Sequence, residues 1–163
     1  MKTLLIVHFS RTGGAAQMAT AAAQGAADEA EVAVRALGAE AASADDLLAA
    51  DGYLFACPEN LAAMAGEMKA FFDRSYYPAL GRIEGRPYAL LISAGGDGTN
   101  AVRQIDRIVT GWRLKRVAEP VIVNTRAQTP EAILAPKQIG EADLDRCREL
   151  GATLAAGLAL GVF

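Results

Sequence analysis

Hydrophobic and polar positions along this chain alternate between two patterns, one typical of buried strands and one typical of helices. Strands are predicted from short, continuous apolar runs, because a strand covered on both faces carries apolar side chains on both faces. Five such runs occur, at Thr3–Phe9, Glu31–Leu37, Gly52–Cys57, Pro87–Ser93 and Val117–Val123. The second run is the least hydrophobic, so we expect it nearer an edge of the sheet. Pro58 is expected to end the third strand.

Between these runs, apolar residues recur at helical spacing. Met64, Met68, Phe71 and Phe72, for example, fall at i, i+4, i+7 and i+8, which is the apolar stripe of a helix. Five helices are predicted: Gly14–Ala27, Asp45–Ala50, the stripe from Met64 to Phe72, the stripe from Ala101 to Trp112, and the stripe from Leu144 to Leu158. The connection Asn124–Gly140 shows no clear period, and such long connections are often binding loops or oligomer contacts.

Strands that alternate with helices predict right-handed crossovers and a parallel sheet covered by helices on both faces. The 163 residues are enough for one well-buried core and short for two. We therefore expect an α/β fold, a single doubly wound five-stranded parallel sheet, in one domain spanning residues 1–163.

Composition narrows the class of protein. Hydrophobic residues make up 52% of the chain and charged residues 21%, which excludes a disordered chain. A net charge of −3 offers no basic surface for nucleic acid, and no apolar run reaches the roughly 18 residues of a membrane span. Cys57 and Cys147 are far apart and form no metal-binding motif. We expect a cytoplasmic protein that binds no metal, nucleic acid or membrane.

The chemistry is expected beyond the carboxyl ends of the strands, where an open parallel sheet binds its ligand at the point where strand order reverses. The segment after the first strand reads Ser10, Arg11, Thr12, Gly13, Gly14 and Ala15. Glycines let successive backbone N–H groups converge on an anion, and the following helix adds partial positive charge at its N-terminus. The segment is therefore a candidate phosphate cradle, and the alternative is a plain helix cap with a glycine turn.

Two further segments end at the same edge. Pro58, Glu59, Asn60 and Leu61 follow the third strand, and Ser93, Ala94, Gly95 and Gly96 follow the fourth. Glycines in the latter segment would let backbone approach a flat ligand, and Asp97 is placed to cap the next helix. The alternative for this segment is a flexible turn.

Several nucleotide-binding families are excluded by their motifs. The first loop supplies neither the GxGxxG of a dinucleotide fold nor the Gly-Lys-Ser/Thr ending of a P-loop. A response-regulator receiver would need acidic residues after the first strand and at the end of the third. Those positions read His8-Phe9-Ser10 and Ala56-Cys57-Pro58 instead.

Three spaced motifs resemble the flavodoxin-like superfamily, in its branch of NAD(P)H-dependent FMN reductases and quinone reductases. "SRTGGA" resembles the loop that wraps the FMN phosphate. "ADGYLFACPENLAAMAGEMKAFFDR" looks like the stretch around the third strand, with the helix that follows it. "GRPYALLISAGGDG" is similar to the fourth strand and its flavin-side loop. The resemblance covers about residues 2–123.

The resemblance implies strand order 2-1-3-4-5 and a cofactor, FMN. Its phosphate would lie on the loop that begins at Ser10, and the other two segments would line the isoalloxazine ring. It also implies NAD(P)H as the electron donor, a small-molecule acceptor such as a quinone or free flavin, and a homodimer or higher homo-oligomer. Hydride transfer to flavin needs no side-chain acid or base, so no catalytic residue is named.

Two departures from the family pattern keep other functions open. Ala15 stands where the loop usually has a third hydroxyl, and the segment after Pro58 lacks both the stacking aromatic of electron-carrier flavodoxins and the usual glycine. The alternatives are a flavodoxin-type electron carrier and a flavodoxin-like module that has lost its cofactor.

Overall fold

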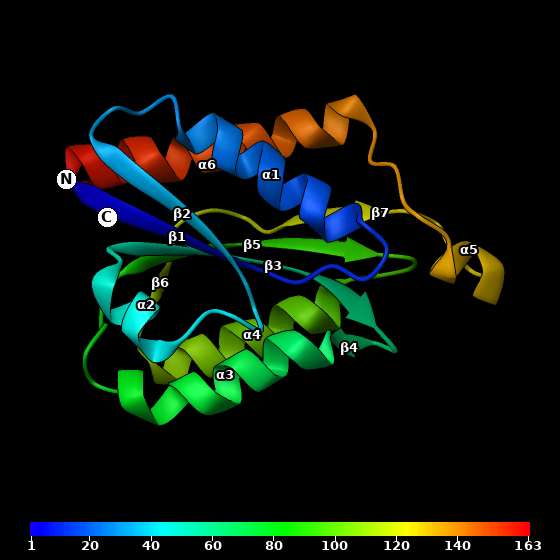
Figure 1. The fold of residues 1–163 in the computed structure, drawn as a ribbon, viewed down its shortest axis with the longest axis horizontal. Helices are drawn as coiled ribbons and strands as arrows, with labels where there is room; N and C mark the ends of the chain where they lie inside the picture. The colour runs from blue at the N-terminus through cyan, green and yellow to red at the C-terminus, as the bar shows by residue number, and fades with distance from the viewer.

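The computed structural model describes residues 1–163 and shows a twisted sheet between two layers of helices (Figure 1). Its main strands are β1 (Lys2–His8), β2 (Val32–Gly38), β3 (Gly52–Asn60), β5 (Pro87–Ala94) and β7 (Val121–Asn124). Two short strands, β4 (Ala63–Met64) and β6 (Lys115–Arg116), extend the sheet.

The strand order is β2-β1-β3-β5, followed by β6 and β7, which both pair with β5. All pairings are parallel except the β3–β4 pair. This confirms the predicted order 2-1-3-4-5 and the edge position of the second strand. The fifth strand was predicted over Val117–Val123, but only β7 overlaps that range, while β6 pairs with the same side of β5 just before it. Pro120, which has no N–H to donate, lies between the two strands.

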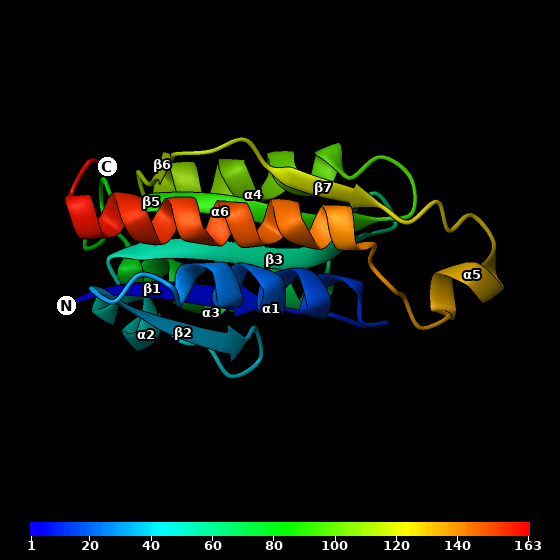
Figure 2. The same cartoon turned by 90° about the horizontal axis from the view of Figure 1, so that it is seen from above.

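The helices are α1 (Gly14–Ala26), α2 (Ala44–Ala49), α3 (Gly66–Ala79), α4 (Thr99–Gly111), α5 (Pro130–Leu134) and α6 (Glu141–Leu160). α1 and α6 cover one face of the sheet, and α2, α3 and α4 cover the other (Figures 1 and 2). The two faces bury separate apolar clusters of 20 and 24 residues. Since α1 and α2 lie on opposite faces, the winding direction reverses between β1 and β3.

Two predictions, one about the end of the third strand and one about the start of the next helix, are wrong. Pro58 does not end the strand, because it pairs with Ser93 of β5 on one side. On its other side the pairing with β1 has already ended at Ala56, so the missing N–H of Pro58 costs no ladder hydrogen bond. Met64 is not helical but lies in β4, which turns back on β3 before α3 begins at Gly66.

The turn between β3 and β4 has unusual backbone geometry. Leu61 and Ala62 have φ angles of 50° and 61°, in the left-handed region that residues with a Cβ seldom adopt. Positive φ at both central residues is the pattern of a tight hairpin turn, which usually carries Asn-Gly. The sequence Leu-Ala gave no such turn signal, so the hairpin was not predicted.

The long connection after β7 contains the short helix α5, which projects beyond the rest of the molecule (Figure 2). It projects at the end of the sheet to which the strands point, whereas the two chain termini lie together at the opposite end (Figure 1). No helix combines the length and the apolar character needed to cross a bilayer.

Candidate functional site

The three loops predicted to form the site converge at the carboxyl edge of the sheet. Pro58 and Ser93 are register partners on neighbouring strands. The loop after β1 reaches them from α1: a Cβ added at Gly14 would lie 2.8 Å from Ser93 Oγ. Three segments that lie far apart in the sequence therefore share one small region beside the reversal point between β1 and β3.

The loop Ser10–Ala15 enters α1 with its helix N-terminus open. Gly13, the N-cap, has φ 98°, and no side chain caps the helix. The Gly13 N–H donates to Ser10 Oγ at 3.1 Å, which folds the loop back on itself. The N–H groups of the first helical turn have no acceptor within the helix. Gly14 and Ala15, which begin the helix, are buried, so these groups face a confined space.

This arrangement fits a phosphate monoester. A side chain at Gly14 would press against Ser93, and a side chain at Gly13 would oppose its left-handed backbone, so glycine at both positions keeps the cradle open. The uncapped helix supplies N–H donors and partial positive charge, and the hydroxyls of Ser10 and Thr12 lie in the same loop. Ala15 contributes its backbone N–H but no side-chain donor.

Arg11, the basic residue of the loop, faces an acidic residue on α3. Its side chain is exposed, and its guanidinium lies 3.6 Å from the Glu67 carboxylate at the start of α3. The cation that does approach the loop is Lys137, whose Nζ lies 3.4 Å from Thr12 Oγ1. Lys137 belongs to the connection Asn124–Gly140, where no periodic pattern marked any residue for function.

Gln17 joins this connection to the loop. Its side-chain Nε2 donates to the carbonyls of Gly13 (2.9 Å) and Lys137 (2.8 Å), and its Oε1 accepts from the Ile139 N–H at 3.0 Å. The Lys137 N–H in turn donates to the Thr12 carbonyl at 2.8 Å. No local pattern marked Gln17, because Lys137 and Ile139 lie 120 and 122 residues further along the chain.

The segment after β3 divides into structural and exposed residues. The Glu59 carboxylate accepts hydrogen bonds from the N–H groups of Gly98 (2.9 Å) and Ala101 (3.0 Å), so it caps α4. The predicted cap, Asp97, is wrong: α4 has no cap from its own segment, and Asp97 instead accepts from the Thr99 hydroxyl. Pro58 and Asn60 are half-buried, while the Leu61 side chain is fully exposed at the tip of the turn.

The segment after β5 is covered on one side by the residues that follow β7. Ser93 and Ala94 are buried. The carbonyls of Gly95 and Gly96 accept hydrogen bonds from the Gln128 and Asn124 side chains, and the Thr125 N–H donates to the Ala94 carbonyl at 2.7 Å. This segment is therefore held by the connection Asn124–Gly140, as the loop Ser10–Ala15 is.

Neither His8, at the end of β1, nor Cys57, in β3, has a pKa near 7. Burial lowers the pKa of His8 below its ordinary value, which keeps the imidazole neutral at pH 7. Burial raises the pKa of the Cys57 thiol to about 12, so it stays protonated and is a poor nucleophile.

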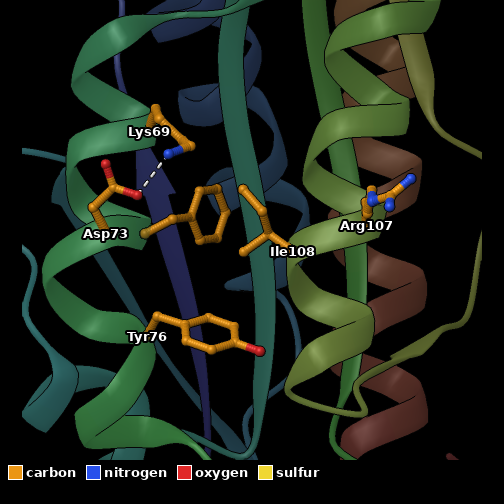
Figure 3. Close-up of a pocket in the computed structure, with 6 residues that line it drawn as sticks. Lys69, Asp73, Tyr76, Arg107 and Ile108 are labelled. Atoms are coloured by element: carbon orange, nitrogen blue, oxygen red, sulfur yellow. Dashed lines mark hydrogen bonds and ion pairs between the residues drawn. The ribbon is translucent and has the colours of Figure 1, made fainter.

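Two other concave regions lie away from the strand ends. One, of about 260 Å³, runs between α3 and α4 and holds the exposed Lys69–Asp73 ion pair (2.6 Å) beside Tyr76 and Ile108 (Figure 3). The Arg107 side chain points away from that pair. The second, of about 330 Å³, lies at the amino ends of the strands near Met1 and Asp51. Neither contains any of the predicted site residues, and neither has a buried polar side chain aimed into it, so we place the candidate site at the carboxyl edge.

Comparison with known proteins identifies the family. The family described as NADPH-dependent FMN reductase matches residues 28–128, more than half of the chain. The match includes the segments at Pro58 and Ser93 but not the loop at Ser10. A protein named flavodoxin from Aquifex aeolicus is 29% identical over 167 residues, which cover 99% of this chain and 90% of the relative, so that alignment spans the loop as well.

Solved structures extend the likeness to the fold. A flavodoxin, WrbA-like protein from Agrobacterium tumefaciens superposes with a TM-score of 0.76 at 22% identity and covers 99% of both chains. A flavodoxin from the domain Archaea gives a TM-score of 0.76 at 18% identity, covering 96% of this chain and 98% of its own. The fold is therefore flavodoxin-like, as the sequence motifs implied.

Proposed function

The chain belongs to the NADPH-dependent FMN reductase family, and on that premise we propose that it binds FMN at the carboxyl edge of the sheet and transfers electrons from NAD(P)H to a small-molecule acceptor. The observation that carries the proposal is the open N-terminus of α1, with Gly13 in the left-handed region and the hydroxyls of Ser10 and Thr12 beside it. That cradle lies where the strand order reverses, the position at which doubly wound sheets bind nucleotides.

In this proposal the loop Ser10–Ala15 holds the phosphate through backbone N–H groups and hydroxyls. The ring is lined by Pro58 and Asn60 on one side and by Ser93–Gly96 on the other. When bound, FMN supplies the hydride acceptor and passes the electrons on. The residues of this chain orient the ring and exclude water from it. A neutral His8 and a Cys57 thiol with a pKa of about 12 are in keeping with chemistry that needs no side-chain acid or base.

We propose an apolar, flat acceptor such as a quinone or a free flavin. Exposed apolar side chains gather at this end of the molecule: Leu61 at the tip of the β3–β4 turn, with Ile133 and Leu134 on α5. A second copy of the chain is the proposed means of covering them, which light scattering of the purified protein would test by its mass.

An electron carrier is the second candidate, favoured by the curated relative named flavodoxin. The two functions differ in one respect, because a carrier needs a separate reductase. Purified protein loaded with FMN is expected to lose its flavin absorbance near 450 nm within seconds of adding NADPH or NADH without air. Bleaching by dithionite alone would favour the carrier, and absence of any bound flavin would favour a module that has lost its cofactor.

The phosphate cradle itself is tested by Gly13→Val, which forces a branched side chain onto a residue with φ 98°. We expect FMN binding to weaken about 100-fold or more, because the converging N–H groups are displaced. The matched control is Gly85→Val, since Gly85 also has positive φ (79°) but lies before β5, at the opposite end of the sheet. Equal FMN affinity in the two variants, measured by quenching of flavin fluorescence, would remove the loop from the site.

A further inference from the structure

We propose that Lys137 binds the phosphate of the flavin and makes the site selective for FMN over riboflavin, which lacks the phosphate. The proposal rests on the proposed function and assigns a role to a residue outside both the family match at residues 28–128 and the loop motif. It makes the connection Asn124–Gly140 part of the cofactor site.

The backbone holds Lys137 against the phosphate loop. Its N–H donates to the Thr12 carbonyl at 2.8 Å, and its carbonyl accepts from the Gln17 side chain at 2.8 Å. The gap between the two segments is narrow, since a Cβ added at Gly14 would lie 3.6 Å from Lys137 Cβ. The lysine is thus fixed beside the residues that begin α1.

The ammonium group is aimed at the loop and is free of any carboxylate. Lys137 Nζ donates to the carbonyls of Ile133 (2.8 Å) and Ala135 (2.7 Å) and, at a longer 3.4 Å, to Thr12 Oγ1. No aspartate or glutamate lies within ion-pair distance of it, whereas Lys2 and Lys69 are both paired. A full positive charge therefore stands uncompensated next to the cradle.

These contacts leave one proton of the ammonium without a short hydrogen bond. The two carbonyls fix the ammonium, and the third proton makes only the long contact with Thr12. A phosphate oxygen in the cradle would accept that proton, while the Thr12 hydroxyl proton would donate to a second phosphate oxygen. Charge-assisted hydrogen bonds of this kind are shorter and stronger than neutral ones.

The other basic residues near this edge are less suited to the role. Arg11 is exposed and its guanidinium faces Glu67. Arg126 is exposed, and its side chain has no hydrogen bond to the loop. Lys137 also compensates for Ala15, because it brings a donor from the far end of the sequence to a loop with one hydroxyl fewer than the family pattern.

The test is the affinity of the full chain for FMN and for riboflavin, measured by quenching of flavin fluorescence at low ionic strength. We expect Lys137→Met to weaken FMN binding about 10- to 100-fold, the equivalent of one charge-assisted hydrogen bond, and to change riboflavin binding by less than about twofold. Lys137→Arg keeps the charge and should retain FMN affinity within about threefold. Lys115→Met is the control, since Lys115 likewise has no carboxylate partner but is exposed and lies in β6, at the other end of the sheet.

Three other outcomes would contradict either this proposal or the proposed function. If Lys137→Met binds FMN as tightly as the wild type, Lys137 does not contact the phosphate. If it weakens FMN and riboflavin equally, the lysine only shapes the loop, and the proposal is overturned. If the wild type binds neither flavin, the proposed function fails and this proposal fails with it. If the wild type binds FMN and Lys137→Met leaves that affinity unchanged, only this proposal is overturned.

Discussion

The Glu59 carboxylate illustrates how a charge at the candidate site serves the fold. It follows β3, at the edge where the flavin ring is proposed to bind, yet both of its oxygens accept hydrogen bonds from backbone N–H groups at the start of α4. Those N–H groups have no acceptor within the helix, and the carboxylate also interacts favourably with the positive end of the helix dipole.

Replacing Glu59 with alanine should therefore reduce stability. We expect Glu59→Ala to lower the free energy of unfolding by about 1–3 kcal/mol, because two buried N–H groups lose their acceptor. Urea denaturation measures the change, with Glu149→Ala on the exposed face of α6 as the control. Identical midpoints for the two variants would show that α4 does not depend on this cap.

The residues that hold the site together were the hardest to predict. Ser10, Thr12 and Gly13 were visible because hydroxyls and glycines at a strand-to-helix junction form a local pattern. Gln17 and Lys137 were not visible, because each acts on a partner about 120 residues away and neither belongs to a local motif. Side-chain contacts at such separation are set by the three-dimensional path of the chain.

At the scale of elements, α1 and α6 pack with their backbones unusually close. A Cβ added at Gly151 of α6 would overlap the Ala22 carbonyl of α1, and a Cβ at Gly25 would overlap the Arg148 carbonyl. Because α1 also begins at the loop Ser10–Ala15, its packing against α6 helps to fix the position of that loop.

Adding one methyl group at this crossing should separate the two helices. We expect Gly151→Ala to destabilise the protein by about 1–3 kcal/mol through overpacking against backbone. Gly66→Ala at the start of α3 is the matched control, since the added Cβ there meets no atom within 4 Å, and it should be neutral or slightly stabilising. Thermal unfolding followed by circular dichroism compares them, and a Gly151→Ala protein as stable as Gly66→Ala would contradict the close packing.

Long elements with a clear period were predicted within a few residues, whereas short ones were not. β1, α1 and β5 each lie within one residue of their predicted limits. β4 was missed because Met64 continues the spacing of the next helix while pairing with Glu59 of β3. Periodicity cannot separate a two-residue strand from the first turn of a helix, and α5 is likewise too short to carry a stripe.

For the whole molecule, strand order followed from few assumptions. Alternating strands and helices with right-handed crossovers allow few parallel arrangements of the strands. The resemblance of the motifs to the flavodoxin-like superfamily implied the order that the structure has. That order also set which loops meet. The family match and the fold do not identify the donor or the acceptor, since these depend on side chains at the rim of the site.

The dependence of stability on pH is a property of the whole molecule. Burial raises the pKa of Cys57 and Tyr53 to about 12 and that of Cys147 to about 11, so the folded state keeps protons that the unfolded chain releases. The stability that these groups give the folded state is fully present below pH 9.0, the ordinary thiol pKa, and is lost as the pH rises toward 12.

At the acidic end, Asp51 has the opposite effect. Burial raises the pKa of Asp51, but hydrogen bonds from the Thr3 N–H and Lys2 outweigh burial, so the net shift of the pKa is downward. Stability from Asp51 is present above pH 3.8 and is lost at lower pH.

We therefore expect a broad plateau of stability that falls on both sides, and that falls less steeply on the alkaline side in Cys57→Ala. Urea midpoints measured from pH 3 to 11 test this. An alkaline limb that is flat in the wild type, or one that is unaltered in Cys57→Ala, would contradict the assignment of buried, protonated thiols.

Both ends of the chain lie at the side of the sheet opposite the β3–β4 turn and α5 (Figure 1). An affinity tag, a fluorescent reporter or a linker to an electrode can accordingly be fused at either end and will lie far from the candidate site. Immobilised in that way, the molecule would present the candidate site outward, and electron transfer could be followed on a surface without interference from the tether.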